Sequence, residues 1–335
     1  MVGLGAVGLA ATRQLLSFDQ VAHITVVQRR PDAVAGVIDA LGAGRDVDVV
    51  AASQRAPAGP ALGDAQVLVV AGGGPLGAPV RAALAAGIPV VVAADDGAEL
   101  RRLRALDAEA RERRVTVALG ATMAPGLSCI LAAHAASGFD QVEEIHVASM
   151  GTGGPACARR HHRALSSASM DWRDGAWVRS PGGSGRELVW FPEPVGGADC
   201  YRAALADPFL LRPAFGGARR ITARLEATRR DRLTSRLPMM RRPHPEGTVG
   251  AVRVDVRGWV GAVPAETILG AAGRPAALAG AVAAQVAVWA AAGRLARAGA
   301  AGLAELVGEP GTFLKELAAR GVHCERFEGA DGGVV

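Results

Sequence analysis

Short valine-rich runs alternate with helical patterns over residues 3–120, and this alternation constrains the fold more than any other feature of the sequence. The runs are bounded by glycine and lie at residues 24–27, 47–50, 67–70, 89–93 and 115–119. Helical patterns lie between several of them, at residues 6–16, 77–86 and 97–113. Short apolar strands separated by helices are typical of a parallel sheet covered on both faces. We therefore expect an α/β fold in which residues 1–122 form a doubly wound, Rossmann-type parallel sheet.

The pattern changes after residue 122, where longer mixed segments begin. Strand candidates at residues 142–148, 187–191, 218–226 and 250–260 are separated by loops rich in glycine and proline. We predict that residues 123–262 form a second, α+β domain for substrate binding and dimerisation. Its arginine-rich stretches, 151–186 and 227–249, are expected to face the ligand. Residues 263–329 are predicted to be a C-terminal helical segment that packs back on the first domain.

Residues 276–293 carry no charge over nearly the length that a helix needs to span a bilayer. Alanine dominates this stretch and gains little from lipid, so we expect a buried or subunit-contacting helix of a homodimer and no membrane partner. The start of the sequence lacks a basic n-region and is unlike a signal peptide. The four cysteines form no CxxC pair, which argues against a disulfide scaffold. A reducing compartment fits this usage, and we expect a cytoplasmic protein.

Arginine supplies almost all of the positive charge. Of the 37 basic residues only Lys315 is a lysine, and the formal net charge is +5. This excludes Schiff-base catalysis, a P-loop and the Tyr-x-x-x-Lys pair of short-chain dehydrogenases, because Tyr201 is followed four residues later by Leu205. The small charge excess, without interleaved aromatic residues, argues against nucleic acid and leaves a small-molecule substrate. With no HxH or HExxH pair in the sequence, we predict no metal site.

A GxGxxG motif opens the first predicted helix. Its glycines permit a tight turn and let a pyrophosphate approach the amides of the helix N-terminus. We assign cofactor binding to Gly3, Gly5, Ala6, Val7 and Gly8. Only Met1 and Val2 precede the motif, so the first strand is truncated. Either the true start lies upstream or the central strand is a stub.

The strand after that helix ends at Gln28, twenty residues beyond Gly8. An NAD enzyme usually places an acidic residue here to bind the ribose, whereas this sequence continues with Arg29 and Arg30. Two guanidinium groups favour the 2′-phosphate of NADP, which arginine can bind with paired hydrogen bonds. The alternative is a solvated arginine pair that opens the next helix.

Two further loops follow strands on the same edge of the sheet, where ligands of open α/β sheets bind. The first loop is expected to let the backbone approach the cofactor, unless it is an ordinary turn, and contains Gly72, Gly73, Gly74 and Pro75. Asp95 follows the next strand and is a candidate ribose contact or general acid/base. Its neighbour Asp96 fits an N-cap better.

Two later segments carry the remaining candidates. Gly120 ends a strand, and Pro125 and Gly126 precede a helix that contains Ser128. Free amides there would hold the nicotinamide carboxamide or a substrate carboxylate, so we assign Gly120, Pro125 and Gly126 to the cofactor and Ser128 to the substrate. The alternative is simply a well-capped helix.

In the second domain, His161 and His162 lie between Arg160 and Arg163. Arginine suits a carboxylate substrate and histidine titrates near neutral pH, so we predict substrate binding by the arginines and acid/base chemistry by the histidines. An exposed basic segment is the alternative for this cluster.

These residues resemble the saccharopine dehydrogenase-like NADP-dependent oxidoreductases, in particular their reductase branch. Besides the GxGxxG start, the resemblance rests on the segments 74–80, 85–87, 120, 124–128, 313–314 and 317–322, of which Pro125-Gly126-Leu127-Ser128 is the most specific. It covers most of the chain. The second domain does not allow substrate-binding residues to be matched position by position.

The resemblance implies NADP(H) and hydride transfer at a C–N bond, between an amine and an aldehyde or keto acid. We therefore expect an NADP-dependent oxidoreductase that acts on an imine or amine of a carboxylate-bearing substrate. Two alternatives stay open. One is NADPH-dependent reduction of an activated C=C bond, and the other is a non-catalytic NADP-binding sensor or partner protein.

Overall fold

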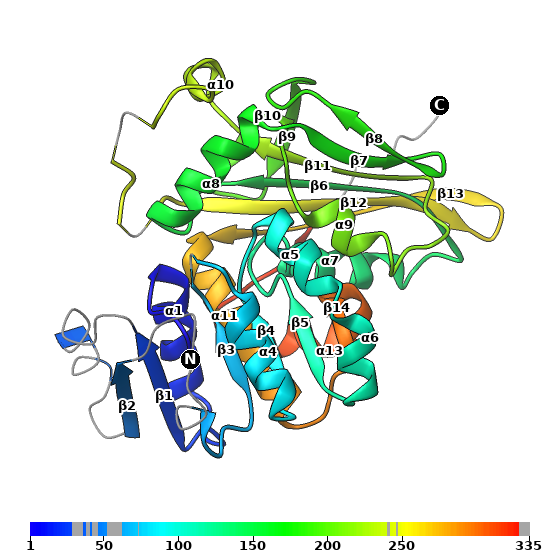
Figure 1. The fold of residues 1–335 in the computed structure, drawn as a ribbon. Helices are drawn as coiled ribbons and strands as arrows, with labels where there is room; N and C mark the ends of the chain where they lie inside the picture. Colours follow the sequence, from blue (N-terminus) through cyan, green and yellow to red (C-terminus); the bar gives the residue numbers. More distant parts are fainter. Residues whose placement is uncertain are drawn as a thin grey trace, which may run out of the picture.

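A computed structural model describes residues 1–28, 36–37, 41, 46–51, 62–72, 74–239, 242–245 and 247–327. Two sheets lie one above the other, with helices around the lower sheet and between the two (Figure 1). The lower sheet is parallel throughout and consists of β1 His23–Gln28, β2 Asp46–Ala51, β3 Leu68–Val70, β4 Val90–Val92, β5 Thr116–Leu119 and β14 Gly299–Gly302. The predicted doubly wound parallel sheet is thus confirmed.

The residues before the glycine motif lie in the middle of this sheet. Val2 forms parallel bridges with Val27 on one side and Val70 on the other. Its amide donates to the carbonyl of Val69 at 2.8 Å, and its carbonyl accepts from the amide of Ala71 at 2.8 Å. The strand order is therefore β2-β1-Val2-β3-β4-β5-β14, and the chain leaves the central position toward both sides.

Helices cover both faces of the lower sheet, as its buried strands require. They are α1 Ala6–Leu16, α4 Gly77–Ala85, α5 Gly97–Arg104, α6 Asp107–Glu112, α11 Pro275–Ala291, α12 Leu303–Leu306 and α13 Pro310–Ala318. Every residue of β3 and β4 is buried. The uncharged stretch forms α11, which is buried almost all round because α1, β3 and β4 pack against it. Within the described residues, no helix is long and apolar enough to cross a membrane.

The upper sheet is mixed and has the order β15-β13-β12-β6-β11-β10-β9, with the hairpin β7-β8 attached to β11. Its strands are β6 Gln141–Met150, β7 Ser169–Arg173, β8 Ala176–Ser180, β9 Glu187–Phe191, β10 Gly196–Arg202, β11 Arg220–Glu226, β12 Gly250–Val260, β13 Val263–Gly273 and β15 Glu325–Arg326. Helices α7 Leu127–Ala136, α8 Pro155–Ser166, α9 Asp207–Leu211 and α10 Arg229–Thr234 accompany them.

Residues 263–329 were expected to be a C-terminal helical segment, but they contain three strands, of which β15 is a two-residue strand paired with β13. The two longer strands differ most from the expectation. Residues 263–273 form β13, which pairs with β12 along its whole length in the upper sheet. Residues 299–302 form β14, which adds a strand beside β5 in the lower sheet. Both are rich in small residues, whose weak strand propensity concealed them, and sheet pairing overrides that propensity.

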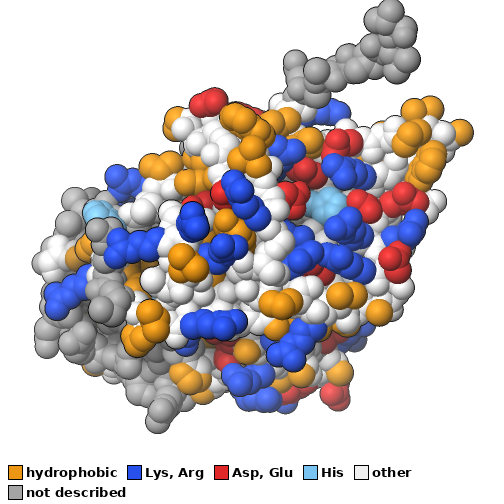
Figure 2. Space-filling view, turned by 90° about the horizontal axis from the view of Figure 1, so that it is seen from above, with side chains coloured by type: hydrophobic (Ala, Val, Ile, Leu, Met, Phe, Trp, Pro, Cys, Tyr) orange, Lys and Arg blue, Asp and Glu red, His pale blue; other side chains and the backbone are white. Residues whose placement is uncertain are grey.

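The two faces of the upper sheet differ sharply. Toward the lower layer, Ile145, Val254 and Val256 are fully buried against α7. On the outer face, basic and acidic side chains are intermixed (Figure 2), and they form pairs such as Arg257 with Glu266 and Arg253 with Asp255. One apolar core therefore joins the two layers, and it places α8 above the carboxyl ends of the parallel strands.

Candidate active site

Packing requires glycine at two positions of the GxGxxG turn, whereas at the third position there is space for a side chain. Gly3 has φ +88°, and a Cβ there would lie 3.0 Å from Cα of Gly72. A Cβ on Gly8 would lie 2.1 Å from the carbonyl oxygen of Gly3. At Gly5, by contrast, none of the described residues places a heavy atom within 4 Å of a Cβ. Gly5 is therefore the point where another molecule has room to approach the backbone.

Gly5 is also the N-cap residue of α1. Within the described part of the chain no side chain caps this helix end. The helix dipole and the amides of Ala6, Val7 and Gly8 therefore remain suited to an anion. Since α1 starts directly after the central Val2, this end lies at the switch point of the sheet, the usual place for a dinucleotide.

The predicted ribose position is only partly described. Gln28 ends β1 and is half-buried, while Arg29, Arg30 and Gly73 lie outside the described residues. In the next loop, Gly72 packs against Gly3 and the amide of Leu76 donates to Oε1 of Glu99 at 2.8 Å. Gly74 is half-buried there and Pro75 is exposed. This loop is thus fixed beside the glycine turn.

A polar cluster forms where β4 ends and α8 passes over it. Asp95 follows β4 and forms an ion pair with Arg160. Oδ2 of Asp95 lies 4.0 Å from Nε2 of His161 and 3.6 Å from Sγ of Cys157, which in turn lies 3.5 Å from Nε2 of His161. The structure thus brings Asp95 together with Arg160 and His161, which the sequence analysis placed in a separate cluster. Sequence reasoning missed Cys157, although it precedes His161 by one helical turn.

Burial governs the protonation of this cluster. It lowers the pKa of His161, against the opposing charge of Asp95, and thereby favours the neutral imidazole. Burial, reinforced by the Asp95 carboxylate, raises the pKa of the Cys157 thiol to about 12. Burial alone would lower the pKa of Arg160, but the ion pair with Asp95 outweighs it and raises that pKa. The cluster is close to neutral, with a fixed carboxylate and guanidinium pair.

The start of α8 lies against the glycine turn. A Cβ on Gly154 would lie 3.1 Å from Cβ of Ala6, so the two helix N-termini almost touch. Cys157, Arg160 and His161 then follow along α8, above the same edge of the sheet. The uncapped end of α1 and the polar cluster therefore belong to one site between the two layers.

Two predicted residues of α8 do not join this cluster. His162 donates from Nε2 to the carbonyl oxygen of Leu237 at 2.7 Å, on the side of α10. Arg163 is exposed and donates to the carbonyl of Arg159 at 3.3 Å. Successive residues of a helix are rotated by about 100°, so four consecutive side chains cannot share one site. His162 and Arg163 therefore lie outside the polar cluster, and the acid/base role of His162 and substrate binding by Arg163 stay predictions.

The turn before α7 also differs from expectation, because two amides at the start of the helix are already used. Leu127 donates to the carbonyl of Thr122 at 2.9 Å, and Ser128 donates to that of Met123 at 3.1 Å. Gly126 has φ +136°, and a Cβ there would lie 2.2 Å from the oxygen of Thr122. The turn from Gly120 to Gly126 is thus closed on itself. The amides of Leu127 and Ser128 are therefore not available to a nicotinamide, and Pro125 has no amide hydrogen. The assignment of Gly120, Pro125 and Gly126 to the cofactor stays a prediction.

Ser128 does not face a substrate. Its side chain is fully buried, and its hydroxyl donates to Oδ1 of Asp207 at 2.6 Å. Burial raises the pKa of Asp207 to about 6, and the charge of Asp95 contributes in the same direction. The substrate-binding role of Ser128 is therefore corrected to a structural one. Asp207, which sequence reasoning missed, lies electrostatically close to the polar cluster.

Asp96, in contrast, behaves as predicted. Its Oδ1 accepts from the amides of Ala98 and Glu99, both at 3.0 Å, and so caps α5. With Asp96 occupied at the helix end, Asp95 is the carboxylate of this loop that turns toward α8.

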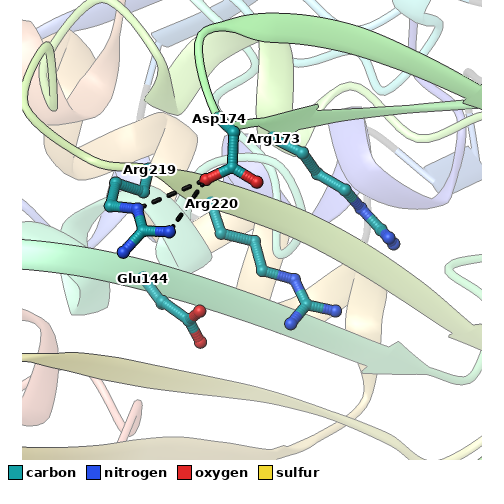
Figure 3. Close-up of a pocket in the computed structure, with 5 residues that line it drawn as sticks. All are labelled: Glu144, Arg173, Asp174, Arg219 and Arg220. Atoms are coloured by element: carbon teal, nitrogen blue, oxygen red, sulfur yellow. Dashed lines mark hydrogen bonds and ion pairs between the residues drawn. The ribbon is translucent and has the colours of Figure 1, made fainter.

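A cavity of about 190 Å³ lies elsewhere, on the outer side of the upper sheet (Figure 3). Its lining comprises Glu144, Arg173, Asp174, Arg219 and Arg220. Arg219 and Asp174 form an ion pair at 3.1 Å, and both are largely exposed. None of the predicted site residues lines this cavity, so it is separate from the candidate active site.

No protein-family model and no curated protein matches this sequence. Its fold is similar to that of saccharopine dehydrogenase (L-Glu forming) from Saccharomyces cerevisiae, with TM-score 0.69 and 13% identity over 98% of this chain and 99% of that chain. The C. glutamicum DAP dehydrogenase in complex with DAP gives TM-score 0.51 and 14% identity over 95% and 97%. Amine dehydrogenase from Mycobacterium smegmatis gives TM-score 0.50 and 13% identity over 91% and 94%. This chain therefore has, over nearly its whole length, the two-layer Rossmann-type fold found in these dehydrogenases.

Proposed function

We propose that this chain is an NADP-dependent oxidoreductase that transfers hydride at the C–N bond of a small, carboxylate-bearing imine or amine. The observation that carries the proposal is the open space at Gly5, in front of the uncapped N-terminus of α1 and at the switch point of the sheet. Apart from the chain neighbours of Gly5, no described atom lies within 4 Å of a Cβ built there, which leaves room for a pyrophosphate. The polar cluster of α8 lies over the same sheet edge, where the reacting end of such a cofactor would extend.

The residues of the first layer fit a dinucleotide. The amides of Ala6 and Val7 would bind the pyrophosphate at the positive end of α1. Gln28 would contact the ribose, and Arg29 with Arg30 would bind the 2′-phosphate that distinguishes NADP from NAD. The bound cofactor would supply the hydride. The protein would supply the position of the substrate and the exclusion of water.

Two observations favour a C–N bond as the substrate group. The solved structures of similar fold include an amine dehydrogenase and a saccharopine dehydrogenase. An iminium carbon is already electrophilic, so its reduction requires little beyond orientation of the substrate and one proton. This reaction needs no Schiff base with a lysine, which suits a chain whose single lysine is Lys315. Arg160 would orient the substrate carboxylate, and Asp95 with His161 would hold the proton.

Cofactor affinity and turnover test this proposal together. We expect tight NADPH binding by fluorescence titration and weaker NADH binding. A buried charge-assisted contact is worth about 1.5–3 kcal/mol, so Arg29→Gln should weaken NADPH binding roughly tenfold or more and leave NADH nearly unchanged. NADPH oxidation with pairs of an amine and a 2-oxo acid should follow. Equal affinity for the two cofactors would contradict the NADP assignment, and oxidation driven by enones alone would contradict the C–N assignment.

A further inference from the structure

Asp95, Cys157 and His161 bring an oxygen, a sulfur and a nitrogen donor to one point between the two layers. Sγ of Cys157 lies 3.5 Å from Nε2 of His161 and 3.6 Å from Oδ2 of Asp95, and the last two atoms are 4.0 Å apart. All three side chains are partly buried. We infer that Asp95, Cys157 and His161 form a binding site for a divalent transition-metal ion of the zinc class.

The spacing of the three donor atoms matches the edges of a zinc tetrahedron. Zinc–ligand distances of about 2.3 Å to sulfur and about 2.0–2.2 Å to nitrogen and oxygen give ligand–ligand separations of about 3.3–3.6 Å. Both separations from the sulfur already fall in this range. The separation between Asp95 and His161, 4.0 Å, would close by roughly half an ångström through a small rotation of the carboxylate.

Regular elements hold the ligands in place. Cys157 and His161 are four residues apart on α8, so they lie on one face of the helix, as paired metal ligands on helices do. Asp95 lies three residues after the end of β4, whose residues are all buried. No metal motif is visible in the sequence because two ligands are separated from the third by about sixty residues, a spacing outside the short zinc motifs.

The surroundings suit a metal-bound thiolate and carboxylate. Arg160 pairs with the other oxygen of Asp95, Oδ1, and so fixes the carboxylate with Oδ2 toward the cluster. Partners of this kind orient ligands and increase metal affinity.

The ligand set selects the metal. A sulfur ligand disfavours Mg²⁺ and Ca²⁺, which prefer oxygen, and suits zinc. As the metal–sulfur bond forms, the thiol proton passes to solvent and no atom changes oxidation state. The Cys157 thiolate and the Asp95 carboxylate together balance the 2+ charge of the metal ion. With the guanidinium of Arg160 included, the site has a net positive charge. Three protein ligands leave a fourth position for water or a substrate carboxylate, as in catalytic zinc sites. With the metal bound, Asp95 and His161 act as ligands, and the water at this position takes over the proton that they would otherwise hold.

Cobalt spectroscopy of the tag-free, full-length protein tests the site. Co²⁺ titration should show one equivalent bound, with visible bands of tetrahedral cobalt and a near-ultraviolet thiolate-to-cobalt charge-transfer band. Cys157→Ser should abolish the charge-transfer band, and both Cys157→Ser and His161→Gln should weaken zinc binding at least roughly tenfold in competition with a chelating dye. The matched controls Cys324→Ser and His162→Gln should retain full binding.

A second measurement uses the unmodified protein, so it does not depend on the folding of a variant. Zn²⁺ should slow alkylation of Cys157, measured by peptide mass spectrometry, and leave Cys324 unaffected. No charge-transfer band, a band that persists in Cys157→Ser, or equal alkylation with and without Zn²⁺ would overturn the metal site. NADPH titration of the same samples separates the two proposals: binding of NADPH without cobalt refutes the metal site alone, and binding of cobalt without NADPH refutes the proposed cofactor.

Discussion

Replacing Gly5 by valine should weaken cofactor binding strongly without harming the fold. Gly5 has φ −75° and ψ −173°, an extended conformation that valine adopts readily. Within the described residues, nothing lies within 4 Å of a Cβ at this position. The folded protein therefore has both the backbone and the room for this side chain, whereas a pyrophosphate on the α1 amides would meet its methyl groups.

The size of the effect follows from the hydrogen bonds that the valine would break. A charge-assisted hydrogen bond is worth about 1.5–3 kcal/mol, and a pyrophosphate pushed away from the helix end would forfeit two of them. A change of about 3–6 kcal/mol in binding free energy corresponds to a decrease in NADPH affinity of about 10²–10⁴-fold. The free energy of unfolding should stay the same or rise by about 0.4–1 kcal/mol, because valine restricts the unfolded chain more than glycine does.

Fluorescence titration with NADPH and urea unfolding measure these two quantities. Gly217→Val is the matched control, since it is equally open in the described structure but lies before β11, away from the turn. Gly8→Ala is the opposite case, because its Cβ would lie 2.1 Å from the oxygen of Gly3, and it should destabilise the fold. If Gly5→Val binds NADPH as tightly as the parent, the pyrophosphate does not bind at this turn. If Gly5→Val unfolds, the open space does not exist.

Three further predictions concern the interior of the site and one of its arginines. Burial raises the pKa of Asp207 from 3.8 to about 6, so the neutral carboxyl stabilises the fold at low pH, and about 3 kcal/mol is lost as the pH rises from about 4 to 6. Measured by urea unfolding, the free energy of unfolding of Asp207→Asn should rise by that amount relative to the parent over the same pH interval. If the two pH profiles run parallel, the pKa of Asp207 is not raised. Gly126→Ala should lower the free energy of unfolding by at least about 2 kcal/mol, since its Cβ would lie 2.2 Å from the Thr122 oxygen; unchanged stability would refute the closed turn. Arg160→Met should raise the KM of a carboxylate substrate roughly tenfold with NADPH affinity unchanged, whereas the exposed Arg159→Met should alter neither; an unchanged KM in Arg160→Met would remove it from the site.

The lower sheet could be predicted from sequence because its strands are buried on both faces. Runs such as Val90–Val92 have few alternatives to a buried strand, and the glycine motif marked the start of α1. Strands in the second half of the chain were harder to predict. β13, Val263–Gly273, lies near the sheet edge, and β14, Gly299–Gly302, consists of glycine and alanine. Neither has the alternating or valine-rich pattern that marks a strand, and only pairing with β12 and β5 makes them strands.

The parts of the candidate site that follow the ends of parallel strands could be predicted from the sequence. Asp95 at the end of β4 and the turn at Gly3–Gly8 required only the rule that ligands bind beyond parallel strand ends. On α8, residues that are adjacent in the sequence point in different directions. His161 faces Asp95, while His162 contacts Leu237. The helix period, applied from His161, would have selected Cys157 in place of His162. The hydrogen-bond partner of Ser128, Asp207, lies 79 residues away in the sequence and left no local signal.

Isotope transfer tests the proposed reaction most directly. The full-length protein is incubated with NADPH that carries deuterium at the hydride-donating carbon, together with pairs of an amine and a 2-oxo acid, and the products are analysed by mass spectrometry. We expect a single deuterium on the carbon bonded to nitrogen, and its loss in Gly5→Val. Bound NADPH that delivers deuterium to no imine, or only to the carbon of an activated C=C bond, would contradict hydride transfer at a C–N bond.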